Sequence, residues 1–107
     1  MYRVLFGVYR KPGLSYEDFL DHYENVHVPI ARRFAGLRAY DIHPVVPGED
    51  DGGPDAFAIM TFDSEEDFQA VLASPEFAEA VADNEQFVDR FDTYVVGHIP
   101  VVDGAAA

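Results

Sequence analysis

The sequence predicts an α+β domain in which a strand–helix–strand unit occurs twice. Runs rich in Val, Ile, Phe and Tyr alternate with amphipathic stretches that have helical spacing. Each helical stretch opens with a serine that can cap a helix, and loops rich in Gly, Pro and Asp separate the units. The chain has 107 residues, which suits a single domain over residues 1–107. Strands are expected at residues 2–10, 37–46, 56–62 and about 90–96.

The first strand, YRVLFGVYR, is largely apolar on both of its faces. Alternate side chains of a strand point to opposite sides of the sheet. One side therefore receives Val4, Phe6 and Val8, and the other receives Leu5, Gly7 and Tyr9. Strands of this kind are buried on both sides, so we expect both faces of the sheet to be covered.

The first helix is expected to begin after Ser15, its N-cap, with Asp18 at the capping-box position. Its apolar stripe has steps of three and four residues and comprises Phe19, Tyr23, Val26, Ile30 and Phe34. Gly36 is a natural terminator because glycine readily adopts the left-handed conformation. Pro29 lacks an N–H and clashes with the carbonyl four residues back, so we expect a kink or a break near His27.

The second half of the chain repeats this pattern. Pro44 should move the end of the second strand toward a sheet edge, and residues 47–55 form a loop by composition. Ser64 caps the next helix, and Ser74, followed by a proline, restarts it. The stripe of this last helical segment is expected at Phe77, Ala78, Val81 and Ala82. Residues 103–107 are expected to form a disordered C-terminal tail.

This order of elements is the ferredoxin-like βαββαβ pattern, which has a four-stranded antiparallel sheet with both helices on one face. The other face would be bare, although the strands are apolar on both faces. The simplest way to cover it is a second copy of the chain, packed sheet against sheet. The sequence therefore predicts a homodimer that closes into a dimeric α/β barrel.

Composition and charge argue against several classes of partner. The net charge is −13, from 20 acidic and 7 basic side chains, whereas nucleic acids and anionic membranes bind clustered Lys and Arg. We therefore expect neither partner, and we interpret the acidity as a solvated surface rather than as an acidic docking surface. The chain has no cysteine, no apolar run of about 20 residues and no signal-peptide pattern, so a cytoplasmic protein is expected.

His27 is the leading candidate for chemistry, because it continues the apolar stripe that contains Phe19 and Tyr23. These three positions lie within about 80° of arc on a regular helix, so the imidazole should face the sheet. Burial would lower its pKa and keep it neutral at pH 7, as a general base requires. The alternative is a core histidine that only bonds a carbonyl freed by Pro29.

Two further residues could complete such a site. Tyr40 lies in the second strand, and its hydroxyl could polarise a substrate oxygen if that face turns toward the helices. The alternative is a tyrosine that only packs. Asp83 lies one position past the predicted stripe of the last helix. An inward-facing Asp83 would be a partner for His27, whereas most such aspartates are solvated.

No metal ion and no cofactor are expected. His22 and His27 are five residues apart, about 140° around a regular helix, so they should not share a metal ion. His43 and His98 lie on predicted strands and would meet only through tertiary structure, and the acidic residues 49–51 lack the spacing of a calcium loop. The sequence has no GxGxxG, P-loop or GxSxG motif, which argues against nucleotide cofactors and serine hydrolysis.

The segment RKPGLSYEDFLDHYENVHVPIARRFAGLRAYDI, residues 10–42, resembles the opening of the EthD-like family of dimeric α/β barrel proteins. The residues that match its pattern are Phe19, Tyr23, His27, Pro29, Gly36, Leu37 and Tyr40, although Trp is common at the position of Tyr23. The second half is similar too, with FDSEEDFQAVLASPEF and then ADNEQF, which contains Asp83 and Phe87. The likeness extends from about residue 3 to residue 97.

The resemblance implies the fold predicted above and a pocket between the helices and the sheet of each subunit. The histidine that matches His27 is the usual acid–base candidate of the family, and the tyrosine that matches Tyr40 is a second polar group in some relatives. Members include proteins of ether-fuel catabolism, methylmuconolactone isomerases, and dehydratases or cyclases of aromatic polyketide pathways. The aromatic residues expected to bind the substrate are Phe19, Tyr23, Phe68 and Phe87.

We predict a small cofactor-independent enzyme that acts on a small cyclic or polyketide-like carbonyl compound. His27 would remove a proton next to the carbonyl, Tyr40 would bond the enolate oxygen, and Asp83 would orient the imidazole. Isomerisation, cyclisation and dehydration all begin this way. The alternatives are a cofactor-free monooxygenase for an electron-rich phenol or quinol, and a non-catalytic small-molecule binding or stress-related protein. A purely structural dimer would follow if phenylalanine rings filled the pocket, namely Phe19, Phe68 and Phe91.

Overall fold

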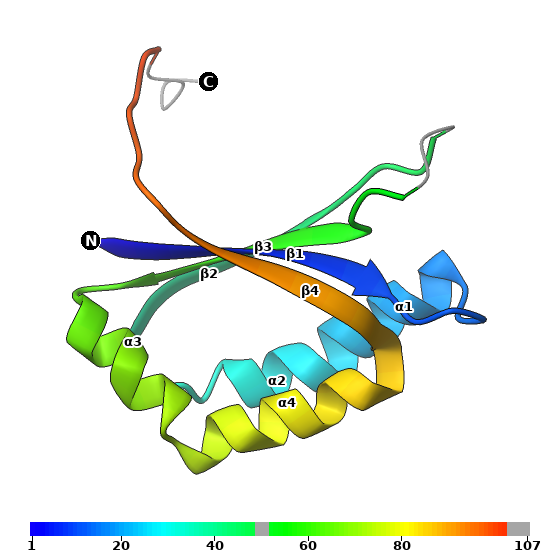
Figure 1. The fold of residues 1–107 in the computed structure, drawn as a ribbon, viewed down its shortest axis with the longest axis horizontal. Coiled ribbons are helices and arrows are strands. Elements are labelled where there is room, and N and C mark those ends of the chain that lie inside the picture. Colours follow the sequence, from blue (N-terminus) through cyan, green and yellow to red (C-terminus); the bar gives the residue numbers. More distant parts are fainter. Residues whose placement is uncertain (49–51, 103–107) are drawn as a thin grey trace.

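The computed structural model describes residues 1–48 and 52–102, in which strands and short helices alternate (Figure 1). The strands are β1 (Tyr2–Arg10), β2 (Leu37–Pro44), β3 (Ala56–Phe62) and β4 (Val88–Val96). The helices are α1 (Tyr16–His22), the π-helix η1 (Tyr23–His27), α2 (Val28–Ala31), α3 (Glu65–Leu72) and α4 (Pro75–Phe87). The predicted acidic turn at 49–51 and the predicted tail at 103–107 lie outside the described residues.

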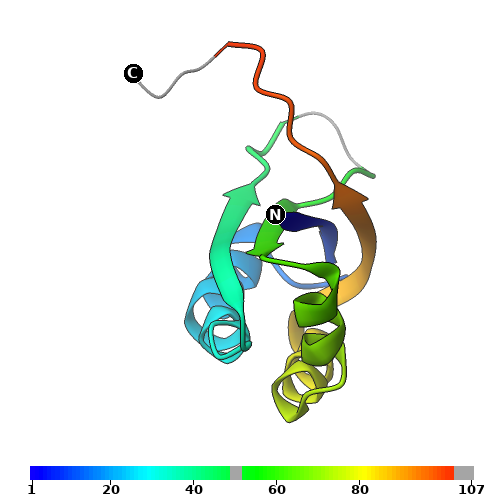
Figure 2. The same ribbon diagram turned by 90° about the vertical axis from the view of Figure 1, so that its left-hand side faces the viewer.

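The strands join one antiparallel sheet in the order β2-β3-β1-β4. Figures 1 and 2 show that the helices of the described chain lie together on one side of this sheet. β1 and β3 are the central strands, and most of the buried strand residues belong to them. This arrangement is the ferredoxin-like βαββαβ fold, so the predicted α+β class is confirmed.

Two strand ends differ from the prediction. β2 ends at Pro44, two residues earlier than expected, although the N–H of Val45 still donates to the carbonyl of Asp55 at 2.9 Å. β4 begins at Val88 without an intervening loop, since this residue is already extended at the end of α4. Val88 pairs with Arg10 beyond an irregularity in the register of β1. The last helix therefore leads directly into an edge strand.

Serine residues cap the helices as predicted. The side-chain oxygens of Ser15, Ser64 and Ser74 each accept a hydrogen bond from the backbone N–H three residues later, at 3.1 to 3.2 Å. A cap of this kind stabilises a helix by about 1 kcal/mol, because it satisfies an N–H that has no partner within the helix. Within the described ranges, no helix is both long enough and apolar enough to cross a bilayer.

The predicted break near His27 takes the form of the π-helix η1. Its closing hydrogen bond runs from the N–H of Val28 to the carbonyl of Tyr23, five residues earlier. Pro29, at the start of α2, has no N–H to give and crowds the carbonyl of Asn25, and a wider helical turn is one way to relieve that conflict. The widened turn changes which side chains share a helix face.

The core between helices and sheet is divided into two clusters. The first contains Val4, Ala31, Phe34, Met60, Phe62, Phe68, Val71 and Ala80. The second contains Val8, Phe19, Tyr23, Ala56 and Phe87. Phe6 of β1 is only partly buried and packs against both clusters. The boundary between the clusters is where a cavity opens.

The opposite face of the sheet carries no helix in the described part of the chain (Figure 2). Ile59, Leu5 and Tyr94 are direct neighbours across β3, β1 and β4, so they form an apolar row on this face. The side chain of Tyr94 is 56% exposed. An apolar row of this kind on an open sheet face is a surface that a partner can cover.

Gly36 gives a test of the connection between the first helical region and β2. Its φ is +79°, a conformation that L-residues other than glycine adopt at a cost. We expect Gly36→Ala to lower the free energy of unfolding by about 1–2 kcal/mol in urea denaturation. Gly48→Ala is the control, because Gly48 lies outside the left-handed region and has no neighbour within 4 Å of an added Cβ. Equal stability of the two variants would contradict this interpretation.

Candidate active site

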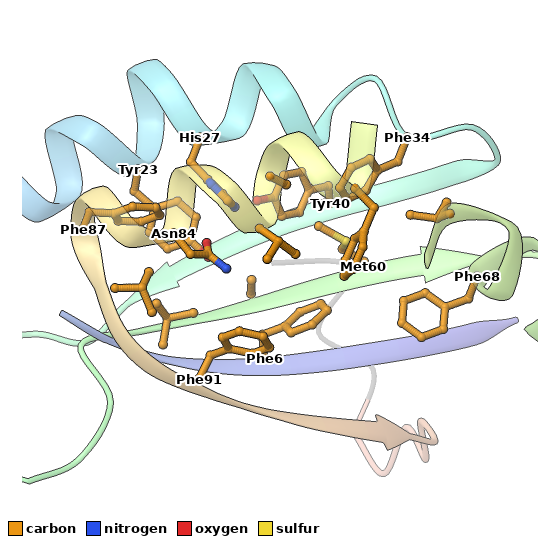
Figure 3. Close-up of a pocket in the computed structure, with 17 residues that line it drawn as sticks. Phe6, Tyr23, His27, Phe34, Tyr40, Met60, Phe68, Asn84, Phe87 and Phe91 are labelled. Carbon is orange, nitrogen blue, oxygen red and sulfur yellow. The ribbon is translucent and has the colours of Figure 1, made fainter. Parts of the chain in front are cut away.

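A cavity of about 70 Å³ lies between the sheet and the helices, where the two core clusters meet (Figure 3). This volume holds several water molecules or a small organic group. Among the described residues that line it, four have polar side chains, namely Tyr23, His27, Tyr40 and Asn84, and none is a Lys, Arg, Asp or Glu. Such a site favours a small neutral ligand with a polar edge.

The polar and aromatic side chains approach the cavity from different elements. His27 comes from η1, Tyr40 from β2 and Asn84 from α4, whereas Phe6 and Phe91 come from β1 and β4. Figure 3 shows that His27 and Tyr40 point into the cavity from the side opposite to the two phenylalanines. A flat ligand could therefore lie against the phenylalanine rings with its polar edge toward the imidazole.

Asp83 holds the imidazole of His27 from outside the cavity. The His27 Nδ1 lies 2.9 Å from the Asp83 Oδ2, and the two side chains are only 12% and 10% exposed. An ionised carboxylate can only accept hydrogen bonds, so Nδ1 must carry the proton. In the neutral ring, Nε2 then has a free lone pair on the cavity side. Asp83 therefore faces inward and contacts His27, which is the arrangement that would make it a partner of the imidazole.

Burial sets the protonation state of His27. Loss of solvent lowers the pKa of the imidazole below its usual value, because the charged form is poorly solvated there. The hydrogen bond and the negative charge of Asp83 act in the opposite direction, and His22 adds a smaller lowering effect. The net direction is downward, so His27 is neutral at pH 7, as expected from the sequence.

The prediction that His22 and His27 point about 140° apart is wrong. His22 Nε2 lies 2.9 Å from Asp83 Oδ1, so both histidines bond the same carboxylate. The reason is η1: the hydrogen bonds of a π-helix span five residues, which places side chains five apart on the same side. Among the described residues, no group of three or more His, Asp or Glu side chains is arranged to hold a metal ion.

Tyr40 and Tyr23 form a second polar pair at the cavity. Burial raises the pKa of Tyr23 far above its usual range, and the interaction with Tyr40 raises it further. Burial also raises the pKa of Tyr40 to about 12, and the nearby Tyr23 hydroxyl acts in the opposite direction. Tyr40 therefore stays protonated at neutral pH, and its O–H can donate to a ligand in the cavity.

Three of the four aromatic residues predicted to bind substrate line the cavity, namely Tyr23, Phe68 and Phe87. The structure does not bring Phe19 to it. Phe19 is fully buried behind the wall, with ring centroids 5.7 Å from Tyr23 and 5.6 Å from Phe87. One turn of helix separates Phe19 from Tyr23, which carries it past the cavity toward the start of α1. Phe68 and Phe91 line the cavity rather than fill it.

Asn84 is a cavity residue that the sequence reasoning missed. The predicted stripe of α4 placed Ala78 and Ala82 inward, but both are exposed. The side chains of α4 that line the cavity are Phe77, Ala80, Val81, Asn84 and Phe87. An asparagine at helical spacing between apolar residues is the same signal that identified His27. Figure 3 shows its amide directed into the cavity.

The sequence matches the model of a known protein family. The model of the EthD domain matches residues 11–91. This chain belongs to the EthD family. The match spans η1, β2 and α4, so it includes every polar residue of the cavity. No curated protein sequence matches the chain.

Solved structures of low sequence identity share this EthD fold. An ethyl tert-butyl ether D family protein from Bacillus halodurans C-125 has a TM-score of 0.76 at 22% identity, covering 92% of this chain and 100% of that one. An EthD-like protein from Ralstonia eutropha JMP134 has a TM-score of 0.65 at 19% identity, covering 99% and 96%. A dimeric ferredoxin-like protein of unknown function from Thermobifida fusca YX has a TM-score of 0.72 at 14% identity, covering 91% and 90%.

The lowered pKa of His27 predicts how stability depends on pH. Below about 6.5 the imidazole of the unfolded EthD chain takes up a proton while the folded one resists it, so the free energy of unfolding falls as the pH falls. His27→Asn should show a smaller loss between pH 7.5 and pH 5.5 in urea unfolding. His43→Asn, on an exposed histidine, should keep the wild-type loss. Equal losses in all three proteins would contradict the burial of a neutral imidazole.

Proposed function

We propose that this EthD-family protein is a cofactor-independent enzyme that moves a proton next to the carbonyl of a small cyclic or polyketide-like compound. The observation that carries the proposal is the pair formed by Asp83 and His27. The carboxylate binds Nδ1 at 2.9 Å, and the ring points into an apolar cavity. A neutral imidazole with a free Nε2 lone pair, held in one orientation, is a competent general base.

In the proposed reaction, Nε2 of His27 takes the proton from the carbon next to the carbonyl. The electron pair of the broken C–H bond moves into the carbonyl, which becomes an enolate. The O–H of Tyr40 donates a hydrogen bond to the enolate oxygen, and the carboxylate of Asp83 stabilises the imidazolium. The imidazolium then returns the proton to another atom, which gives isomerisation, or protonates a leaving hydroxyl, which gives dehydration. Attack of the enolate carbon on a second carbonyl gives cyclisation, and the imidazolium then protonates the new alkoxide oxygen.

The cavity supports a small neutral substrate. Its lining in the described chain contains no Lys or Arg to pair with a carboxylate or a phosphate. A charged group would lose its hydration there without gaining a counterion, which costs several kcal/mol. The rings of Phe6, Phe91 and Phe87 favour an unsaturated or ring-shaped compound.

Deuterium exchange tests the proposal without knowledge of the natural product. Small neutral cyclic ketones and enones are incubated with the protein in D2O, and deuterium uptake next to the carbonyl is followed by proton NMR. His27→Asn should lower the rate by roughly 100-fold or more, because it removes the base. The side-chain NH2 of the asparagine lies at about the position of the imidazole Nδ1–H, so it can keep the hydrogen bond to Asp83.

His43→Asn is the matched control and should exchange at the wild-type rate, because His43 is exposed on β2 and does not line the cavity. An unchanged rate in a folded His27→Asn variant would remove His27 from the mechanism. Oxygen uptake with a phenol or quinol would indicate a cofactor-free monooxygenase instead. Tight binding by the wild type without exchange of any bound compound would indicate a binding protein.

We further infer a homodimer in which the apolar row of Ile59, Leu5 and Tyr94 lies at the interface. The row occupies the sheet face that carries no helix in the described chain, and a second copy would remove it from water. The Thermobifida fusca protein of the same fold is described as dimeric. These two observations support the same assembly.

A charge in the apolar row tests the assembly. Leu5→Glu should shift the protein from dimer to monomer in light scattering coupled to gel filtration, because two such charges would be buried in a symmetric interface. Gln69→Glu adds the same charge on an exposed position of α3 and should stay dimeric. A monomeric wild type, or a dimeric Leu5→Glu variant, would contradict this interface.

A further inference from the structure

We infer that His22 is a positioning residue of the candidate active site: it holds Asp83 from the second side and so keeps His27 oriented with Nε2 toward the cavity. The consequence for turnover rests on the proposed function. The consequence for the orientation and tautomer of His27 does not, and it can be measured separately.

Each histidine makes its shortest contact with a different oxygen of the shared carboxylate. His22 Nε2 lies 2.9 Å from Oδ1 and 3.1 Å from Oδ2 of Asp83, whereas His27 Nδ1 lies 2.9 Å from Oδ2. Because an ionised carboxylate only accepts, both nitrogens must carry protons. The bond from His22 therefore turns Oδ2 toward His27 and limits rotation of the carboxylate.

Asp83 depends on these two bonds for its orientation. Its side chain is 10% exposed, and within the described chain it has no ion pair with Lys or Arg. With His22 removed, the carboxylate would keep one partner and could turn toward water at the mouth of the cluster, where the His22 side chain is 24% exposed. A small displacement of this kind is enough to misplace a general base.

The π-helix η1 is what gives His22 this role. In a regular helix the two rings would point about 140° apart, an arrangement that does not favour one shared carboxylate. The wider turn brings the rings together over Asp83. Single π-helical turns inside α-helices often occur at functional sites.

His22 also packs, and a test must separate packing from hydrogen bonding. Its ring centroid lies 4.7 Å from that of Phe87, and the His27 ring lies 5.0 Å from the same phenylalanine. His22→Gln keeps an N–H at about the position of Nε2 but loses the ring. His22→Phe keeps a ring against Phe87 but loses the donor. The two variants therefore remove one property each.

The readout is the tautomer of His27, observed by nitrogen NMR of protein labelled with 15N-histidine at pH 8. The wild type and His22→Gln should show a protonated Nδ1 and an unprotonated Nε2. His22→Phe should shift His27 toward the tautomer protonated at Nε2. In the deuterium-exchange assay, kcat of His22→Phe should fall by roughly 10-fold or more, with a smaller change in KM. His22→Gln should restore most of the rate.

A wild-type tautomer in His22→Phe would overturn the inference, and so would an equal shift in both variants, because it would assign the effect to packing. If His22→Phe does not fold, His22→Leu also lacks the donor and should shift the tautomer. If the His27 tautomer depends on the His22 donor but the wild type exchanges deuterium into no compound, the role of His22 is supported and the proposed function is contradicted. If the exchange rate depends on the His22 donor but the His27 tautomer does not change, the inference is overturned and the proposed function still stands.

Discussion

The geometry of the site depends on a missing N–H at Pro29. A regular helix through this region would require a donor for the carbonyl of Asn25, and proline has none. The chain adopts the wider turn of η1 just before this point and then continues as α2. This turn determines which side chains of the segment meet α4. One backbone constraint thus brings two imidazoles to the carboxylate of Asp83.

The cavity is a consequence of how a small chain divides its core. Aromatic side chains fill two clusters, one toward each end of the sheet, and Phe6 spans the boundary between them. A close-packed core has few voids larger than a water molecule, so this opening has a cost in lost contacts. Polar groups on its wall would be unfavourable in a dry core; Asp83 satisfies Nδ1 of His27, whereas Nε2 and the Tyr40 hydroxyl remain available to a ligand.

The sequence was sufficient for the fold but not for the whole site. Alternation in the strands and the serine caps are local signals, so the strands, the caps and the break near His27 follow from short stretches of chain. The π-turn is different, because its extra residue changes the phase of everything around it. A regular helix wheel therefore placed His22 on the wrong side. The predicted phase of α4 was also wrong, so Asn84 was not recognised as a cavity residue.

The alternation along β1 has one more consequence. Phe6 faces the cavity, whereas Leu5 before it faces the open side of the sheet, so ligand contacts and partner contacts are one residue apart on the same strand. Point substitutions can alter either set independently. An insertion or deletion within β1 would exchange the two sets at once, because a shift by one residue reverses every side chain. A change in the length of β1 would therefore disturb the cavity and the open sheet face together.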